Sequence, residues 1–327
     1  MSSLTLPTYQ DLLDAQQQLN GKSIYTPLLE NATLNHLTGG RVFLKAEVLQ
    51  HTGSFKLRGA YNFISTLTEK QKKRGLLTYS SGNHAQGVAY ASKLLGAKAT
   101  IIMPSDAPQI KIDNTRAYGA EVILYDRYNE DRETIGANIM HSSGALLIPP
   151  YDHPLIIAGQ GTCGLEILEQ LSPQGVHLDA VVSCFGGGGL TSGIALAFEQ
   201  KSASTKIYSA EPQGFDDMAR SLVSGKRLSN EVSARSICDA VLTPTPGQVT
   251  FSICNDLLEQ GLVVTDDEVK AAVKFAFNTL KVVVEPGGAV ALAAILHKKI
   301  ETKKKAIALT LSGGNVDPSI FKMCLES

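Results

Sequence analysis

The sequence predicts an α/β protein built from two parallel sheets that are each wound with helices. Strand-like apolar runs alternate with helix-like segments along the chain, which is typical of parallel sheets covered on both faces. Glycine and alanine are plentiful, and small side chains let helices pack closely on a sheet. At 327 residues the chain is too long for one typical core, so we expect two domains that share a cleft.

The first half of the chain contains a compact unit of four expected strands. Apolar runs place these strands at 76–80, 99–104, 121–126 and 145–150, and the helical spacing of apolar residues places helices at 81–96, 108–119 and 129–144. An earlier strand is expected at 41–48. We interpret residues 75–148 as a small mobile domain, inserted into a large domain that is formed by residues 1–74 and 149–327.

The second half of the chain repeats this alternation. Strands are expected at 179–185, 206–212 and 305–311, and a helix is expected at 191–200. Residues 265–268, Thr-Asp-Asp-Glu, have the pattern of a capping box, in which an N-cap hydroxyl and an acid three residues later bind each other's backbone amides. They therefore predict the start of another helix.

Charge and hydropathy exclude some classes of partner. The chain has 30 basic and 31 acidic residues, and its formal net charge is -1. Nucleic acids and membrane surfaces favour basic patches, so we expect neither as a partner. The apolar run at 289–296 ends after eight residues, which is far too short to span a membrane.

The cysteines and the N-terminal segment favour a cytoplasmic protein. Cys163, Cys184, Cys238, Cys254 and Cys324 are scattered, odd in number and without a CxxC pair. This pattern is typical of reduced thiols and not of a disulfide framework or a zinc site. Residues 1–7 lack the basic stretch and apolar core of a signal peptide.

Glycine-rich and polar motifs follow three of the expected strands. They are "SSGNH" (80–84), "FGGGGL" (185–190) and "SGGN" (312–315). In open α/β sheets, ligands bind in the crevice at the carboxyl ends of the strands. Each motif is also expected to begin a helix, whose first N–H groups and dipole favour an anion. The three motifs together therefore predict a crevice for an anionic ligand.

Four consecutive glycines, Gly186 to Gly189, are the strongest signal, because a backbone without side chains can wrap a phosphate closely. A flexible turn is the alternative. A dinucleotide is a rival ligand, since Glu211 lies about twenty residues on, near a ribose-binding position. However, the last glycine of a G-x-G-x-x-G motif would fall on Thr191 or Ser192. No Gly-Lys-Ser/Thr follows, as a P-loop would require.

The stretch "SFKLRGA" (54–60) places Lys56 between an aromatic residue and a leucine. A buried ammonium is costly, so most lysines are solvated at the surface. An amine beside a phosphate-bearing aldehyde forms an imine, which removes much of this cost, and lysine does this with pyridoxal phosphate. Lys56 and the glycine run together therefore indicate pyridoxal 5'-phosphate as the cofactor.

Five motifs, in this order, resemble those of the fold-type II pyridoxal-phosphate enzymes, which share the fold of the tryptophan synthase β chain. They are "SFKLRGA", "SSGNHAQG" (80–87), "AGQGT" (158–162), "GGGGL" (186–190) and "SGGNVD" (312–317). Over nearly its whole length the chain resembles the serine/threonine dehydratases and serine racemases. The resemblance implies two parallel-sheet domains with the cofactor in the cleft, held mainly by the large domain.

The resemblance also implies roles for individual residues. Lys56 would carry the cofactor and move the Cα proton on one face of the substrate. Phe55 would pack near the pyridine ring, and Asn83 would hydrogen-bond the ring oxygen. Ser312 would meet the pyridine nitrogen. The phosphate would be cradled by the backbone amides of Gly186, Gly187, Gly188, Gly189 and Leu190.

Two of the serines have alternative roles. A neutral hydroxyl such as that of Ser312 at the pyridine nitrogen suits β-elimination and is poor for transamination; a helix cap is its other possible role. Ser81 stands where racemases carry a second acid/base, and it could equally contact the substrate or cap a helix. The substrate carboxylate would be bound by the loop of Ser80, Ser81, Gly82, Asn83 and His84.

A second site is expected in "AEPQGFDD" (210–217). Racemase-like members of the family bind a divalent cation through a Glu, an Asp and a backbone carbonyl, at positions that match Glu211, Asp217 and Phe215. Such oxygen ligands suit Mg²⁺ or Ca²⁺, and Mn²⁺ is a further candidate. The alternative is an ordinary solvated acidic turn.

We therefore expect a pyridoxal-phosphate-dependent ammonia-lyase that converts L-serine- or L-threonine-type 3-hydroxy amino acids into a 2-oxo acid and ammonia, with serine racemase as a second activity. A 3-hydroxyaspartate dehydratase or an amino-acid racemase is the alternative main activity. The former needs a cation for the distal carboxylate, and Arg58 and Arg116 are the arginines that lie near a motif.

Two other classes are disfavoured. An NAD-dependent dehydrogenase conflicts with the failed glycine spacing, and a non-catalytic binding protein conflicts with an intact Lys56. The partner should be a small amino-acid substrate. We also expect a homodimer, since symmetric dimers are the commonest assemblies, and closure of the small domain over the substrate.

Overall fold

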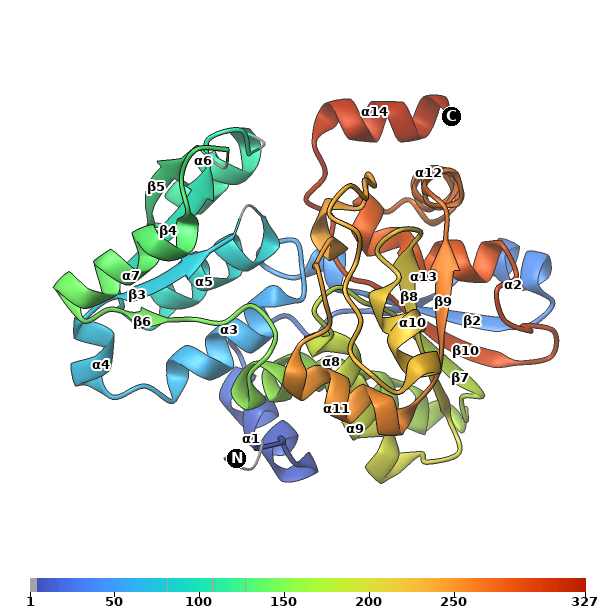
Figure 1. Cartoon of the computed structure of the whole chain (residues 1–327). Coiled ribbons are helices and arrows are strands. Elements are labelled where there is room, and N and C mark those ends of the chain that lie inside the picture. Colours follow the sequence, from blue (N-terminus) through green and yellow to red (C-terminus); the bar gives the residue numbers. More distant parts are fainter. Residues whose placement is uncertain (1–4, 81, 108, 127) are drawn as a thin grey trace.

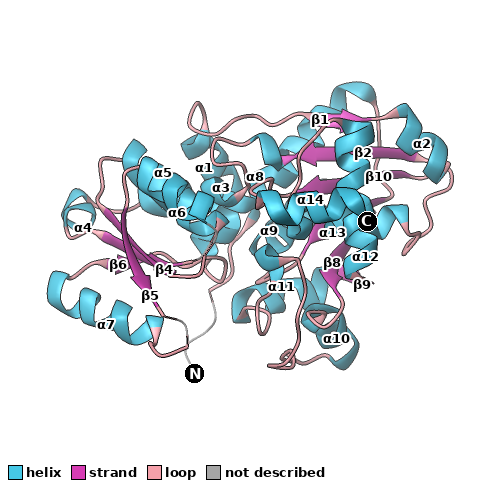
Figure 2. Cartoon of the chain, turned by 90° about the horizontal axis from the view of Figure 1, so that it is seen from above, coloured by secondary structure: helices cyan, strands magenta, loops and turns pink. Residues whose placement is uncertain are grey.

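Two separate sheets organise the fold (Figure 1). The structure is a computed structural model, and it describes residues 5–80, 82–107, 109–126 and 128–327. The larger sheet has six strands in the order β1-β2-β10-β7-β8-β9, and the smaller sheet has four in the order β5-β4-β3-β6. Seen from above, the two sheets lie side by side, and each has its own helices (Figure 2).

The larger sheet is parallel except at one edge. Its strands are β1 (Leu28–Glu30), β2 (Arg41–Ala46), β7 (Ala180–Cys184), β8 (Lys206–Pro212), β9 (Leu258–Val264) and β10 (Ala306–Leu311). The short edge strand β1 is antiparallel to its neighbour β2. The strands expected at 41–48, 179–185, 206–212 and 305–311 are confirmed. Strand β9 was not expected, because it directly follows a helix and its second and third residues, Glu259 and Gln260, are polar and exposed.

Helices cover both faces of the larger sheet. The helices associated with this sheet are α1 (Tyr9–Leu19), α2 (Ala32–Thr38), α8 (Pro154–Leu171), α9 (Gly189–Lys201), α10 (Asp217–Ser224), α11 (Gln248–Leu257), α12 (Asp266–Phe275), α13 (Pro286–Leu296) and α14 (Pro318–Glu326), with the short helical segments η1 (Glu47–Leu49), η2 (Ser172–Gln174), η3 (Asp239–Val241) and η4 (Ala276–Leu280). Helix α3 (Lys56–Ser65) packs between α8 and the helix α5 (Asn83–Leu94) of the smaller unit. The predicted capping box at Thr265 is confirmed, and it begins α12. In the described part of the chain, no helix is long and apolar enough to cross a bilayer.

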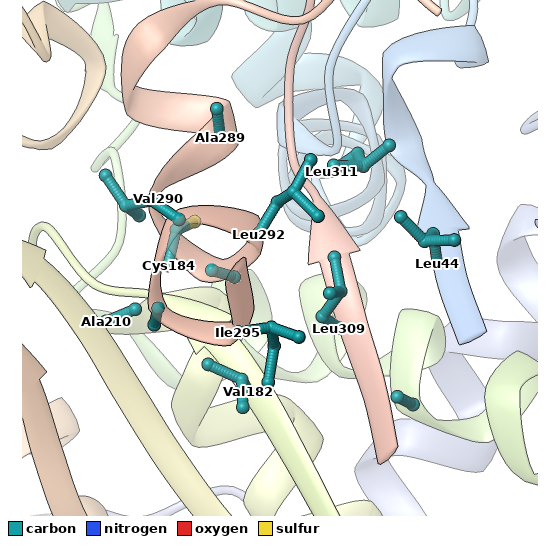
Figure 3. Packing of buried hydrophobic residues seen from close by; sticks show 14 of the residues in the cluster. Leu44, Val182, Cys184, Ala210, Ala289, Val290, Leu292, Ile295, Leu309 and Leu311 are labelled. Atoms are coloured by element: carbon teal, nitrogen blue, oxygen red, sulfur yellow. The ribbon is translucent and has the colours of Figure 1, made fainter. Parts of the chain in front are cut away.

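Helix α13 forms the centre of the main core. Its residues are almost all apolar and buried, so it packs against β7, β8 and β10 without a polar face. Figure 3 shows Val290, Leu292 and Ile295 among side chains of these strands. On the other side of the sheet, α8 and α9 meet at Gly161 and Gly193, where a Cβ on either residue would overlap the facing backbone. This close approach holds the start of α9 firmly against α8.

The smaller sheet is wholly parallel. Its strands are β3 (Leu76–Tyr79), β4 (Ala99–Pro104), β5 (Glu121–Tyr125) and β6 (Leu146–Leu147), with helices α4 (Glu69–Lys73), α5 (Asn83–Leu94), α6 (Gln109–Ala117) and α7 (Arg132–Ser143). The strand expected at 145–150 is only two residues long, because Pro149 and Pro150 have no N–H to donate to a ladder. The mobility of this unit and its boundaries at 75 and 148 stay predictions.

Candidate active site

A cavity lies where the larger sheet ends in its glycine-rich turns and the helices α3 and α5 begin. Its lining includes every residue that was predicted to bind the cofactor: Phe55, Lys56, Asn83, Gly186, Gly187, Gly188, Gly189, Leu190 and Ser312. Five further residues complete the lining, namely Tyr151, Gln160, Cys184, Ala240 and Val241. All five motifs, which are far apart in sequence, therefore contribute residues to one space, and their roles toward a ligand stay predictions.

Lys56 is the first residue of α3, and its amine faces this cavity. The Nζ atom donates a hydrogen bond to the carbonyl oxygen of Pro150 at 2.9 Å and lies 5.2 Å from the centre of the Phe55 ring. Burial lowers the pKa of Lys56 to about 8, against a smaller opposite effect of the Cys184 thiol. A substantial fraction of the amine is therefore neutral near physiological pH, as a nucleophile or a proton acceptor must be.

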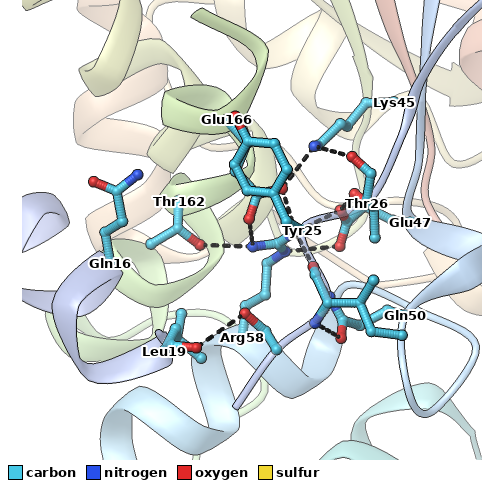
Figure 4. Close-up of polar contacts among 12 residues, drawn as sticks. Gln16, Leu19, Tyr25, Thr26, Lys45, Glu47, Gln50, Arg58, Thr162 and Glu166 are labelled. Atoms are coloured by element: carbon cyan, nitrogen blue, oxygen red, sulfur yellow. Dashed lines mark hydrogen bonds and ion pairs between the residues drawn. The ribbon is translucent and has the colours of Figure 1, made fainter. Parts of the chain in front are cut away.

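On the Arg58 side of α3, a buried ionic network holds this helix in place (Figure 4). The Arg58 guanidinium donates to Glu47 at 2.8 Å through two nitrogens and to Glu166 at 2.6 and 2.9 Å. Lys45 donates to Glu166 at 2.6 Å. All four side chains are almost completely buried. Two cations and two anions thus balance each other and tie α3 to β2, η1 and α8.

Neither of the two arginines that were considered for a distal carboxylate lies at the cavity. Arg58 is fully engaged in the ionic network and buried. Arg116 is on an exposed face of α6, where its nearest acid, Asp113, is 4.0 Å away. A cation for a second substrate carboxylate must therefore come from elsewhere.

The glycine turn between β7 and α9 presents unpaired backbone donors. Gly188 has φ +96°, a conformation that favours glycine, and a Cβ on Gly187 would overlap the Tyr151 ring. Among the described residues, the amides of Gly186 to Leu190 donate to no protein acceptor, although most of this turn is buried. Buried amides nearly always have a partner. Unpaired amides at a helix N-terminus therefore fit a phosphate, as pyridoxal phosphate would supply.

Ser312 directly follows β10 and lines the same cavity. Its carbonyl oxygen accepts from the amide of Phe55 at 3.1 Å, which joins this turn to the start of α3. The alternative role of Ser312 as a helix cap is wrong, because α14 begins only at Pro318 and is capped by Asp317. The expectation that "SGGN" begins a helix is wrong for the same reason. Residues 312–317 separate β10 from α14.

A polar cluster joins the two sheet-based units beside the cavity. Asn83 donates to Glu285 at 2.5 Å and accepts from Asn315 at 2.8 Å. The second oxygen of Glu285 is buried, has no hydrogen-bond partner among the described residues and lies 4.0 Å from Lys111, which donates to Asp239 at 2.6 Å. Burial raises the pKa of Glu285 to about 7, against the lowering by Lys111. Asn83 is therefore firmly oriented, with a second amide hydrogen still available for a ligand.

The expected substrate loop lies at the start of α5. Gly82 precedes this helix, and its amide donates to the Ser80 hydroxyl at 3.3 Å. His84 is buried, and its Nε2 lies 3.2 Å from the carbonyl oxygen of Ile148, so this nitrogen carries the proton. Burial, together with the charge of Lys56, lowers the pKa of His84 to about 3, which makes it a neutral structural donor. Ser81 lies outside the described residues.

The acids of the expected metal site lie together at the start of α10. Glu211 accepts from two backbone amides of this helix, both at 2.8 Å, and Asp217 accepts from Asn230 at 2.6 Å. Burial raises the pKa of Asp217 to about 6, and burial and the charge of Asp217 raise that of Glu211. The other oxygen of Asp217 is buried without a partner in the described structure. Neither carboxyl group forms an ion pair with a described side chain, and neighbouring carboxyl groups that resist ionisation fit a divalent ion.

In the described part of the chain, no cluster of three or more His, Cys, Asp or Glu side chains is arranged to hold a metal. An ion at Glu211 and Asp217 would therefore need backbone oxygen or water as its remaining ligands. Phe215 lies in the turn between these two acids and is half-buried. Its carbonyl oxygen stays the predicted third ligand.

Sequence reasoning missed three residues around the cavity. Lys111 is buried on the same face of α6 as Ile112 and Thr115, and this helical spacing was the available signal. Gln160 lies inside the "AGQGT" motif, which was noted without a role for its glutamine. Tyr151 directly follows two prolines, and nothing in the sequence indicated that its ring would pack on Gly187.

Comparison with known proteins gives consistent likenesses. A family model described as "Pyridoxal-phosphate dependent enzyme" matches residues 21–313. Serine racemase of Schizosaccharomyces pombe is 42% identical over 315 residues, which cover 96% of each chain. L-threo-3-hydroxyaspartate ammonia-lyase of Pseudomonas sp. is 42% identical over 323 residues, which cover 99% of this chain and all of the relative. The structure of maize serine racemase has a TM-score of 0.91 at 35% identity, and the match covers 98% of both chains. The expected fold class is thereby confirmed.

Proposed function

The chain belongs to the pyridoxal-phosphate-dependent enzymes, and from this premise we propose that it is an ammonia-lyase of L-serine- and L-threonine-type 3-hydroxy amino acids. The products would be a 2-oxo acid and ammonia. One observation carries the proposal: the Lys56 amine faces the same cavity as the unpaired amides of the glycine turn. A phosphate at the turn and an amine in the same cavity suit a phosphorylated aldehyde cofactor.

The residues of this chain have distinct tasks in that reaction. Pyridoxal phosphate, when bound, supplies an electron sink for the charge that develops at the substrate Cα. Lys56, with its lowered pKa, takes the Cα proton in its neutral form. The amides at the start of α5 bind the substrate carboxylate. Asn83, oriented by Glu285 and Asn315, would donate to the cofactor ring oxygen, and the neutral Ser312 would meet the ring nitrogen.

A lyase of 3-hydroxyaspartate is the second candidate, because one buried cation lies beside the expected substrate loop. A Cβ on Gly82 would lie 3.5 Å from Lys111 Nζ. A dicarboxylic substrate would need such a cation for its distal carboxylate. Since Lys111 already pairs with Asp239, that carboxylate would compete with a side chain, which is why we rank this candidate second.

Racemisation at the same site is a further part of the proposal. One carbanion serves both outcomes, and proton delivery from the face opposite Lys56 decides between them. Ser81 is the residue that we assign to this delivery. The serine racemase relative supports the assignment to the same degree that the lyase relative supports elimination, since both are 42% identical to this chain.

Three further properties belong to the proposal. Glu211, Asp217 and the carbonyl of Phe215 would hold Mg²⁺, or Ca²⁺ or Mn²⁺ in its place, which relieves the repulsion between the two buried carboxyl groups. All five cysteines are free thiols, which suits a cytoplasmic location. A homodimer is proposed on the base rate of symmetric assemblies. Light scattering of the purified protein would measure this state directly.

The proposal is tested with the purified protein and three substrates. L-Serine, L-threonine and 3-hydroxyaspartate are incubated with the enzyme and cofactor, with and without Mg²⁺ after chelation, and both 2-oxo acid and D-enantiomer are measured. We expect 2-oxo acid from serine and threonine, a visible absorbance band, and borohydride labelling of Lys56 in the presence of cofactor. A colourless protein that takes no label would overturn the proposal, and D-enantiomer without 2-oxo acid would identify a racemase.

A further inference from the structure

Gln160 reaches from α8 to the glycine turn. Its side chain crosses Gly59 of α3, where a Cβ would lie 3.0 Å from Gln160 Cγ, and its amide ends against Gly189, where a Cβ would overlap Oε1. It lines the cavity together with Lys56 and the glycine turn. The residue is 1% exposed. The buried amide of Gln160 therefore lies against the N-terminus of α9.

Both polar atoms of the Gln160 amide are buried without a hydrogen-bond partner in the described structure. Other polar side chains near α8 have one: Asn62 donates to the Leu155 carbonyl at 2.8 Å, and Thr162 donates to the Gly159 carbonyl at 2.7 Å. An unpaired buried amide costs about 1–3 kcal/mol, so an arrangement that leaves both atoms unpaired needs a reason. A ligand in the cavity would supply the missing partner.

Charge narrows the identity of that partner. Apart from Lys56, the described residues that line the cavity include no cationic side chain. A dianionic phosphate at the glycine turn would thus depend on neutral donors and on the dipole of α9. A glutamine amide carries two N–H donors, and rotation of the amide by half a turn about its last side-chain bond places either its oxygen or its nitrogen toward Gly189.

We propose that Gln160 is a cofactor-binding residue whose Nε2 donates to the phosphate group of pyridoxal phosphate. The assignment rests on the proposed function, because it takes the cofactor as given. It gives the phosphate one side-chain donor in addition to the backbone amides of Gly186 to Leu190. It also gives Gln160, whose amide is unpaired among the described residues, the partner that its burial requires.

Gln160→Met tests this contact, because methionine has a similar length and no donor. Affinity is measured by fluorescence titration of apo-protein with pyridoxal 5'-phosphate and, separately, with pyridoxal, which lacks the phosphate. We expect about tenfold weaker binding of the phosphorylated compound and unchanged binding of pyridoxal. The melting temperature of the apo-protein should stay the same or rise, since a buried unpaired amide is removed.

Gln160→Glu and a matched control complete the design. The glutamate has the same shape and places an acceptor, or a negative charge, against the phosphate, so its loss of affinity should exceed that of the methionine variant. Gln160→Glu also provides the test of the contact if Gln160→Met fails to fold. Gln86 is the control: it is equally buried at 1% exposure, both its amide atoms are unpaired in the described chain, and it does not line the cavity. Gln86→Met should leave both affinities unchanged.

Each outcome decides the assignment. Selective loss for the phosphorylated compound in Gln160→Met or Gln160→Glu supports it. Equal loss for pyridoxal and its phosphate would overturn it in favour of a packing role, and so would unchanged affinities or a matching loss in Gln86→Met. Wild-type protein that binds neither compound would instead overturn the proposed function, and this assignment with it.

Discussion

The two faces of α3 differ in whether their buried polar groups have hydrogen-bond partners. Lys56 and Arg58 are two residues apart, which on a helix turns their side chains by about 200°. On the Arg58 face, the guanidinium and the amine of Lys45 find carboxylates and oxygens at 2.6–3.4 Å. On the Lys56 face, the amine has the Pro150 carbonyl, and the nearby glycine amides and Gln160 have no protein partner in the described structure.

The difference separates a structural site from a binding site within one helix. A buried charge whose hydrogen bonds are all made has none left for a ligand. Buried donors without partners are unfavourable, and a ligand that accepts their hydrogen bonds stabilises them. The two faces are therefore distinguished by whether their polar groups have hydrogen-bond partners, more than by charge or burial. We call the Arg58 face, where they have partners, the closed face, and the Lys56 face the open face. Substitutions that remove one feature at a time from each face test this distinction.

Removal of the amine from the open face should have the largest effect on activity. Lys56→Ala removes both the cofactor-carrying group and the proposed base, so kcat with L-serine should fall on the order of 10⁴-fold or more. The fold should persist, because the amine makes one hydrogen bond and its burial is itself unfavourable. Steady-state kinetics and circular dichroism measure the two effects, and normal turnover in this variant would exclude Lys56 as the base.

Removal of the guanidinium from the closed face should have the largest effect on stability. Arg58→Met leaves Glu47 and Glu166 with one cation between them, and breaking a buried pair costs about 3–5 kcal/mol. Burial alone would raise the pKa of Glu47, but the charge and hydrogen bonds of Arg58 lower this pKa. Urea unfolding measures the loss.

A surface pair of the same type provides the control for Arg58. Arg41 binds Glu30 through two nitrogens at 2.8 and 2.9 Å, and both side chains are partly exposed. Arg41→Met should cost less than about 1 kcal/mol, because water screens an exposed pair. Equal losses in the two variants would show that burial does not distinguish these pairs.

Most of the fold could be predicted from the sequence, because local signals were strong there. Strand β8 and strand β4 were predicted with their correct limits, since each is an apolar run bounded by polar or turn-forming residues. Helix α7 was expected to start at 129, but it begins at Arg132 because Asp131 caps it. Strand β9 has exposed polar residues at its second and third positions, and its position depends on pairing with β8, which no local pattern contains.

The site was predictable where the backbone makes it and less so where side chains meet across units. Lys56 and the glycine turn belong to contiguous motifs, so a short window of sequence contains them. The pairing of Lys111 with Asp239 joins residues that are 128 positions apart, and that of Asn83 with Glu285 joins residues 202 apart. The unpaired state of Gln160 depends on three helices at once, and sequence patterns carry no signal for such a packing defect.

A methyl group in the glycine turn should have an intermediate effect. In Gly187→Ala the new Cβ overlaps the Tyr151 ring, so the turn or the ring must shift and the amides lose their arrangement. We expect about tenfold weaker binding of pyridoxal 5'-phosphate, since such overpacking costs about 1–3 kcal/mol. Gly136→Ala in α7 is the control, because its neighbours lie at 3.4 Å or more and alanine favours a helix. An unchanged affinity in Gly187→Ala would mean that this turn does not hold the phosphate.

Glu285 should make the stability of the protein depend on pH; one of its oxygens is unpaired in the described structure and the other is bonded to Asn83. Burial raises its pKa from 4.5 to about 7, so in this range the folded protein holds a proton that the unfolded chain has lost. The free energy of unfolding should therefore fall as the pH rises from about 4.5 to 7. Glu285→Gln keeps the acceptor for Asn83 and should flatten this decline, as measured by urea unfolding at pH 5, 6, 7 and 8. A difference between variant and wild type that is the same at every pH would show that the carboxyl group does not titrate there.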